Sequence, residues 1–161
     1  MMVLLREYKD IDIVEMTDIW NAVVEDGIAF PQVESLSYSE AEEYFSDQTY
    51  CGVAEYRGDI AGLYILHPNN VGRCGHIGNT SYAVKENFRG KKIGRALVED
   101  SIKRAKEFGF KILQFNAVVK TNYSAIHLYE DMGFKKLGMI PKGFLLKNGT
   151  YEDIILFYFE L

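Results

Sequence analysis

The chain has 161 residues, of which 48% are hydrophobic, 25% are charged and only three are proline. This length and composition predict one folded, soluble domain over residues 1–161 and exclude a largely disordered chain. The formal net charge of −5 argues against a general nucleic-acid-binding protein, because such domains are usually basic.

The first third of the chain predicts a strand, two helices and a hairpin. Apolar residues recur at helical spacing between Asp10 and Val24, and Asp10 or Asp12 can cap that helix. Ser39 and Glu42 have the spacing of a capping box. The turn Arg57-Gly58-Asp59 joins two β-rich runs into a hairpin. The expected elements are Met2–Tyr8, Asp10–Val24, Ser39–Gln48, Tyr50–Arg57 and Ile60–Leu66.

The rest of the chain alternates strands and helices before it ends in two strands. The expected elements are strand His76–Val84, helix Ile93–Phe108, strand Lys111–Val119, helix Asn122–Met132, and strands Phe134–Leu146 and Tyr151–Phe159. This order predicts an α/β protein with a mixed sheet and helices on both faces.

A basic, glycine-containing turn joins the strand that ends at Val84 to the helix that begins near Ile93. Five cations lie within residues 85–95, against the single anion Glu86. A helix N-terminus presents unpaired N–H groups and about half a positive charge, and glycines allow close approach to the backbone. The segment is therefore suited to a pyrophosphate. A solvated basic helix start with a packing glycine is the structural alternative.

The charge distribution along the chain is uneven. Residues 1–60 carry a net charge of −11, and residues 61–161 carry +6. This asymmetry is explained either by chance placement of solvated charges or by a second part that faces an anion and a first part that tolerates cations.

A second informative segment begins at Asn122, which can cap the helix that follows. Ala125, Leu128 and Met132 share one helix face, and Tyr129 lies about two turns beyond Asn122. A tyrosine at an apolar helix position is usually a core residue, so its interpretation depends on the preceding segment.

Together the two segments resemble the GNAT superfamily of N-acetyltransferases. Residues 89–97 (RGKKIGRAL) are similar to its acetyl-CoA signature R/Q-x-x-G-x-G/A, with Lys92 in place of the first glycine. Residues 122–134 are similar to its downstream motif, with Asn122, Tyr129 and the pair Gly133-Phe134 at matching positions. The resemblance implies a mostly antiparallel sheet of about seven strands whose central strands splay apart.

The resemblance also implies an enzyme that transfers acetyl from acetyl-CoA to an amine. Tyr129 is then the acid that protonates the leaving thiolate, and Asn122 contacts CoA. A backbone N–H near Val84 polarises the thioester carbonyl. The CoA-binding residues implied are Tyr82, Ala83, Val84, Arg89, Gly90, Lys91, Lys92, Ile93, Gly94, Arg95 and Asn122. The general base remains open among Glu25, Glu86, His76, His127 and a water chain.

Two asparagines interrupt strands that we expect to be central and apolar. A buried amide without a partner costs roughly 1–3 kcal/mol, so Asn79 and Asn116 each need a reason to be there. They either satisfy backbone groups freed where the strands splay or bind a polar group of the acceptor. Residues 68–82, with Phe115-Asn116, also resemble a subgroup that includes fungal acetyltransferases of proline analogues. That resemblance implies a small amino or imino acid whose carboxylate lies near both amides.

Two other classes of function remain possible. A non-catalytic acyl-CoA sensor on the same fold would not need Tyr129 as an acid, and a protein or peptide N-acetyltransferase would need an open groove. We expect no metal, because Cys74 and His76 lack further ligands at suitable spacing. No secretory signal or membrane span is visible, which predicts a cytoplasmic protein with no membrane partner. The aromatic strand Tyr151–Phe159 could help to form a homodimer.

Overall fold

The computed structural model describes residues 2–161 as a seven-stranded mixed sheet with four α-helices, and it confirms the predicted fold class. The strands are β1 (Leu4–Glu7), β2 (Tyr50–Tyr56), β3 (Asp59–Pro68), β4 (Ile77–Val84), β5 (Ile112–Val119), β6 (Lys135–Leu145) and β7 (Tyr151–Glu160). The helices are α1 (Ile13–Asp26), α2 (Tyr38–Ser46), α3 (Ile93–Glu107) and α4 (Tyr123–Asp131).

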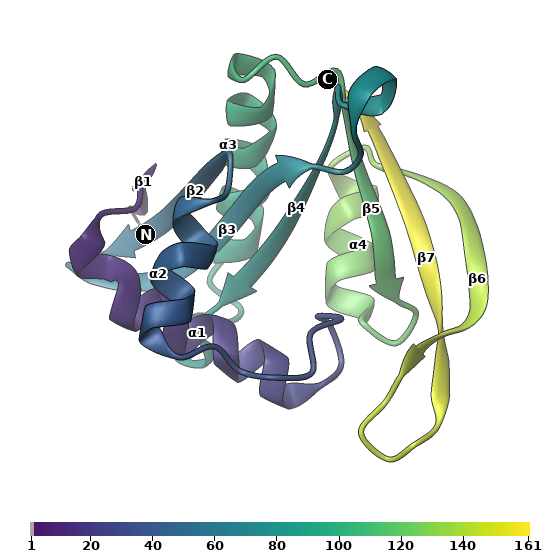
Figure 1. Ribbon diagram of the computed structural model, residues 1–161, viewed down its shortest axis with the longest axis horizontal. Coiled ribbons are helices and arrows are strands. Elements are labelled where there is room, and N and C mark those ends of the chain that lie inside the picture. The colour runs from purple at the N-terminus through teal and green to yellow at the C-terminus, as the bar shows by residue number, and fades with distance from the viewer. Residues whose placement is uncertain (1) are drawn as a thin grey trace.

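The sheet is antiparallel except at its centre. Its strand order is β1-β2-β3-β4-β5-β7-β6, and only β4 and β5 run parallel. These two strands pair over two positions, Ile77 with Ile112 and Gly78 with Leu113. Beyond them the strands diverge, as Figure 1 shows, and α4 is seen between them in that view. We call this divergence the split.

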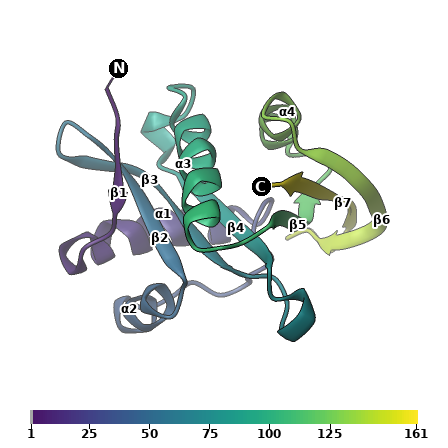
Figure 2. The same cartoon turned by 90° about the horizontal axis from the view of Figure 1, so that it is seen from above.

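Helices cover both faces of the sheet, and each face has its own apolar core. Figure 2 shows α1 and α2 on one side and α3 and α4 on the other. Trp20 is buried with Met16 and Phe45 in the core beneath α1 and α2. The second core gathers residues of α3 and the sheet around Leu97 and Phe157.

Strand alternation assigns the residues of the split to one face or the other. Thr80, Tyr82 and Val84 of β4 face α3, as does Phe115 of β5. Ala83 belongs to the core beneath α1, so Asn79, two pleats back, shares that face. The same argument places Gln114 and Asn116 on the α1–α2 side. The two predicted groups of site residues therefore lie on opposite faces.

Both N-terminal helices begin differently from the sequence expectation. The capping box of α2 joins Ser37 to Glu40, two residues before the predicted Ser39 and Glu42. At α1, Asp12 is the N-cap residue, but its carboxylate makes no capping bond to the helix.

The Asp12 carboxylate instead ties β1 to the start of α1. It accepts hydrogen bonds from the Arg6 guanidinium at 2.7 and 3.0 Å and from the Lys9 backbone N–H at 2.7 Å. Arg6 also donates to Glu55 of β2 at 2.8 Å. Asp12 is nearly buried, and these hydrogen bonds, above all those from Arg6, hold the pKa of its carboxyl below the usual value.

Candidate active site

The turn before α3 has an unusual backbone that leaves its N–H groups free. Gly90 and Lys92 both have positive φ, +76° and +63°. Within residues 2–161, the structure pairs none of the N–H groups of residues 90–95 with an acceptor, and α3 has no side-chain cap. A Cβ added at Gly94 would lie 3.6 Å from Leu128 Cδ2, so close packing does not require glycine there. These features fit an anionic group such as the pyrophosphate of CoA.

Two arginines around this turn already have acidic partners, and one lysine packs over an aromatic ring. Arg89 lies 3.6 Å from Asp26 of α1, and Lys91 lies over the Phe88 ring. Arg95 is held by Asp131 of α4 at 2.6 Å. Part of the charge asymmetry of the sequence is therefore neutralised by ion pairs within the protein. We therefore expect the backbone, more than these side chains, to contact the phosphates first.

The backbone of β4 is open toward the split at alternate residues. The Lys85 N–H donates to Ala61 O at 2.8 Å, so Lys85 and Ala61 form a hydrogen-bonded pair. In an antiparallel ladder such pairs alternate, so every second residue of β4 before Lys85 is also hydrogen-bonded to β3. Tyr82 and Val84 lie between such pairs, so their N–H and C=O groups point toward β5, where no strand is paired with them. A pantetheine arm can pair with these groups. Ala83, predicted with them, has its backbone turned to β3 and its side chain buried beneath α1.

The Tyr82 hydroxyl is fully occupied by a chain of hydrogen bonds. Thr80 Oγ1 donates to Tyr82 Oη at 2.7 Å, and Ser101 Oγ donates to the Val98 carbonyl at 2.8 Å. Ser101 has then used its proton, so the 2.8 Å bond between Tyr82 and Ser101 is donated by Tyr82. Burial raises the pKa of Tyr82 to about 12. This tyrosine therefore keeps its proton and holds its ring in place at the split.

Tyr129 lies beside Tyr82, and within residues 2–161 its own hydroxyl makes no hydrogen bond. Its ring packs against Phe115 at 4.7 Å between centroids, against Phe157 at 5.6 Å and against Tyr82 at 6.2 Å. Within residues 2–161 no hydrogen-bond partner is found for its Oη, which is also not fully buried. Burial, and to a smaller extent the neighbouring Tyr82, raises the pKa of Tyr129, so the phenol is protonated at neutral pH. The structure thus places a fixed, protonated donor at the split.

Asn122 caps α4, as the sequence predicts. Its Oδ1 accepts from the Ala125 N–H and the Ser124 hydroxyl, both at 3.4 Å. Both bonds are long, and both use the oxygen, which leaves the Asn122 amide N–H₂ free for a ligand. Its role as a CoA contact stays a prediction.

Asn79 and Asn116 are brought together on the α1–α2 face by a third asparagine. Asn79 Nδ2 donates to Asn69 Oδ1 at 3.2 Å, and Asn69 Nδ2 donates to Asn116 Oδ1 at 3.2 Å. Asn116 returns a short bond to Asn69 Oδ1, and Gln114 Nε2 donates to Asn116 Oδ1 at 3.1 Å. We call these four residues the amide cluster.

The amide cluster corrects part of the sequence argument. Asn116 is exposed and Asn79 is half-buried, because β5 has already left β4 at this point. Their amide partners are side chains, not backbone groups freed by the split. Asn69 and Gln114 were not predicted from the sequence. Asn69 follows Pro68 in a stretch dense in turn residues, which gave it a sufficient local explanation.

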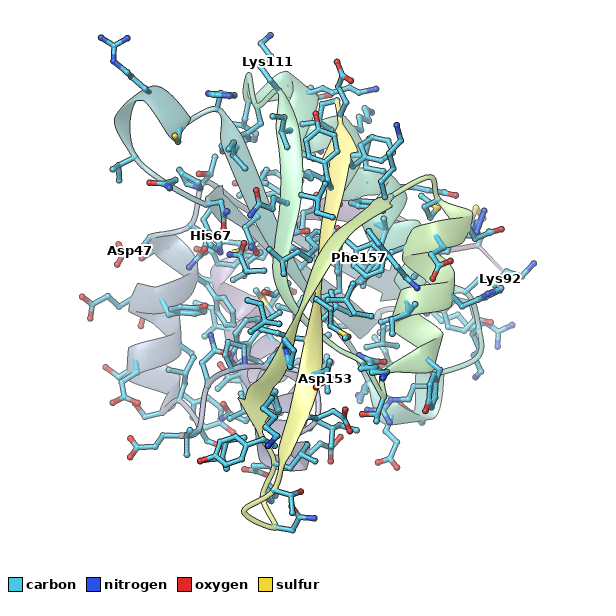
Figure 3. The ribbon with its side chains drawn as sticks, turned by 90° about the vertical axis from the view of Figure 1, so that its right-hand side faces the viewer. Asp47, His67, Lys92, Lys111, Asp153 and Phe157 are labelled. Atoms are coloured by element: carbon cyan, nitrogen blue, oxygen red, sulfur yellow. The ribbon has the colours of Figure 1, made fainter. Side chains whose placement is uncertain are left out.

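Figure 3 shows the two sides of the site in one view. Lys92, at the start of α3, lies on the side of α4, and His67, the cross-strand partner of Asn79, lies on the other side of the sheet. In the part of the chain that the structure describes, no group of three or more possible metal ligands is found. None of the helices among residues 2–161 has the length and hydrophobicity of a membrane span.

The split, the open β4 edge and the unpaired α3 N-terminus are together suited to an extended ligand with an anionic group, such as an acyl-CoA. Comparison with known proteins gives the class of protein. The model of the acetyltransferase (GNAT) family matches residues 16–134, so the chain belongs to that family. The prediction of an enzyme that uses acetyl-CoA is confirmed at this level.

Individual relatives extend over nearly the whole chain. N-acetyltransferase aca1 of Schizosaccharomyces pombe is 28% identical, over 90% of this chain and 78% of its own length. A GCN5-related N-acetyltransferase from Kribbella flavida is 28% identical with a TM-score of 0.90, covering 99% of this chain and 98% of its own.

A phosphinothricin acetyltransferase from Sinorhizobium meliloti, solved in complex with acetyl-CoA, shares the fold. Its TM-score is 0.92 at 24% identity, and the match covers 100% of this chain and 89% of the other.

Proposed function

We propose that this enzyme transfers acetyl from acetyl-CoA to the amine of a small molecule that also carries a carboxylate, such as an amino or imino acid. The observation that carries this proposal is the two-sided site. A free phenol and an unpaired helix N-terminus face one side of the split, and a cluster of neutral amides faces the other. The first set suits CoA, and the second suits a small polar acceptor.

The proposed mechanism assigns each group a separate task. Acetyl-CoA supplies the acetyl group as a thioester. The N–H groups of residues 90–95 bind its pyrophosphate, and the Tyr82 and Val84 backbone pairs with the pantetheine arm. A neutral amine attacks the carbonyl carbon, the carbon–sulfur bond breaks, and the sulfur leaves as a thiolate. The attacking nitrogen releases its proton to a water molecule and so becomes the amide nitrogen of the product. Tyr129 donates its proton toward that sulfur, while a backbone N–H near Val84 stabilises the oxygen charge of the transition state.

The geometry also weighs against the two alternatives. An acyl-CoA sensor has no use for a phenol whose hydroxyl is left without a protein partner at the split. A peptide N-acetyltransferase would have to thread a chain past the amide cluster, whose members already bridge β3, β4 and β5. We therefore favour a small acceptor.

A panel of acceptors tests the proposal. The enzyme is incubated with acetyl-CoA and amino acids, imino acids, polyamines or peptides, and CoA release and the mass of the product are measured. We expect acetylation of small amino or imino acids. Turnover of polyamines or peptides alone would overturn the carboxylate acceptor, and acetyl-CoA binding without turnover on any amine would support a sensor.

We further propose that the enzyme is a homodimer. The aromatic strand suggested for this role, now β7, lies inside the sheet between β5 and β6, so the available edge is β6. That strand exposes about half of each of four apolar side chains, Leu137, Met139, Ile140 and Leu145. Light scattering after size-exclusion chromatography should give twice the chain mass of 18.4 kDa, and a monomer would refute the proposal.

A further inference from the structure

We infer that Asn69 is a positioning residue that makes the amide cluster selective for a carboxylate over a neutral group. The inference rests on the proposed function, because it concerns the same acceptor site. It starts from the place of Asn69 at the end of β3, where its backbone N–H donates to Ile77 O at 2.7 Å. From this anchored position its side chain reaches both strands of the split.

Asn69 joins β4 to β5 where the sheet itself does not. The strands pair only at Gly78 and the residue before it, and Asn79 is the next residue on β4. Asn69 accepts from Asn79 on one strand and exchanges two bonds with Asn116 on the other. The reciprocal amide pair fixes the orientation of Asn116, and the bond from Asn79 fixes the second amide.

The hydrogen-bond inventory of the amide cluster determines what it can bind. Asn69 Oδ1 and Asn116 Oδ1 each accept two bonds from inside the cluster, so both oxygens are occupied. Each amide nitrogen in these bonds has a second hydrogen that the bonds do not use. At the Asn69–Asn116 pair, where both oxygens are occupied, the groups left free are N–H donors, which match an acceptor-only group such as a carboxylate. The oxygens of Asn79 and Gln114 accept no hydrogen bond within the cluster.

The selection comes from hydrogen-bond donors and not from a counter-charge. The amide cluster is uncharged, and α1 and α2, which cover this face, carry acidic and no basic side chains. The exposure of Asn116 leaves its free N–H open to a ligand. Replacing Asn69 by aspartate keeps an oxygen for the two incoming donors. It removes the donor to Asn116 and adds a negative charge beside the bound carboxylate.

Paired acceptors test the inference. Parent and Asn69→Asp enzymes are assayed with L-alanine and L-proline and with their carboxamides, L-alaninamide and L-prolinamide. We expect the aspartate to raise KM for the acids at least tenfold, to change KM for the carboxamides by less than threefold, and to leave acetyl-CoA affinity unchanged. An equal rise for acid and carboxamide, or no rise, would overturn the inference.

The neighbouring Asn70→Asp variant is the matched control. Asn70 is exposed, lies outside the amide cluster and uses its Oδ1 to accept from the Val71 N–H, which aspartate can also do. It adds the same charge one residue away, and we expect no change in either KM. If Asn70→Asp reproduced the effect of Asn69→Asp, general charge repulsion would explain it and the inference would be wrong.

A binding measurement separates this inference from the proposed function. If neither the acids nor the carboxamides are acetylated, the proposed acceptor class fails. Side-chain ¹H–¹⁵N spectra are then recorded during a titration with sodium acetate. We expect the amide signals of Asn79 and Asn116 to shift in the parent and not in Asn69→Asp. Signals that do not move in the parent would refute the carboxylate site itself.

Discussion

Tyr129 and Tyr82 stand side by side at the split, but only the hydroxyl of Tyr129 is free to act on a substrate. Replacing Tyr129 by phenylalanine removes one oxygen and keeps the ring that packs on Phe115. We expect kcat to fall by about a hundredfold or more, in the range of general acid catalysis. Steady-state kinetics at saturating acceptor measures the effect, and calorimetry should show acetyl-CoA affinity within about twofold of the parent.

The control for this substitution lies on the same helix. Tyr123, the first residue of α4, is 73% exposed. Tyr123→Phe makes the same chemical change away from the split, and its kcat should match that of the parent. A Tyr129→Phe enzyme whose kcat stays within a factor of a few of the parent would assign the acid to another group.

Substitution of Lys92 tests whether the turn before α3 binds acetyl-CoA through its backbone N–H groups. Its φ of +63° is a strained conformation for a side-chain-bearing residue, by about 1 kcal/mol, and glycine adopts it freely. The GNAT signature that this segment resembles has glycine at the same position. Lys92→Gly should therefore keep acetyl-CoA affinity within about threefold and the free energy of unfolding within about 1 kcal/mol.

Calorimetry and urea unfolding give the two readouts for Lys92. Lys92→Ala is the companion variant, because it removes the charge and keeps the strained backbone. A tenfold or larger loss of acetyl-CoA affinity in both variants would show that the ammonium group, not the backbone N–H, contacts the ligand.

At the residue scale, the functional residues that could be predicted from the sequence are those that belong to a motif. Tyr129, Asn122 and the glycines of the turn were found because their spacing along the chain matches a motif. Asn69 was not, because its role depends on contacts with Asn79 and Asn116, the latter 47 residues away. No local pattern distinguishes such a residue from an ordinary turn asparagine.

At the scale of elements, the junction of β1 with α1 predicts acid sensitivity. The pKa of Asp12 is held below its unfolded value of about 3.9, chiefly by the hydrogen bonds from Arg6. A depressed pKa adds stability above the unfolded pKa, and that stability is lost as the pH falls through the folded pKa. Asp12 should therefore stabilise the protein at neutral pH and progressively less below about pH 4.

Asp12→Asn measures this contribution. The substitution leaves Arg6 without its main counter-charge, and we expect a loss of about 2–3 kcal/mol in the free energy of unfolding at pH 7. Urea unfolding of both proteins at pH 7 and near pH 3 should show a difference that shrinks at the lower pH. A difference independent of pH would mean that the ion pair is not its source.

The start of α2 shows why element boundaries were harder to predict. Both Ser37 and Ser39 are followed three residues later by a glutamate, so the sequence offers two capping boxes. Contact with α1 selects the first of these boxes. The Asn21 side chain of α1 hydrogen-bonds both the N–H and the C=O of Leu36, at 2.9 and 2.8 Å. This contact fixes the chain just before Ser37 and could not be read from local spacing.

At the scale of the whole molecule, we propose that residues 1–161 unfold as a single domain. The single tryptophan, Trp20, reports on the core beneath α1 and α2, whereas far-UV circular dichroism reports on all helices and strands. Because one continuous sheet separates the two cores, both probes should give the same urea midpoint. Midpoints that differ by more than experimental error would indicate two independently unfolding parts.

The order of elements along the chain was predictable from hydrophobic periodicity and turn residues. Their order in the sheet was not, because β6 and β7 exchange places relative to the sequence and β7 becomes an inner strand. The splay of β4 from β5 was expected only through the family resemblance. Physically it follows from a parallel contact only two residue pairs long, which no local sequence signal specifies.

The central claim is that acetyl transfer takes place across the split, with the acceptor held by amides on the α1–α2 face. The most direct test is the acceptor saturation curve of Asn79→Ala and Asn116→Ala, with the best acid of the panel as substrate. We predict a rise in acceptor KM of at least tenfold in each variant, with acetyl-CoA affinity and melting temperature nearly unchanged. Variants that keep the parent KM and lose stability instead would contradict the account and make both asparagines structural.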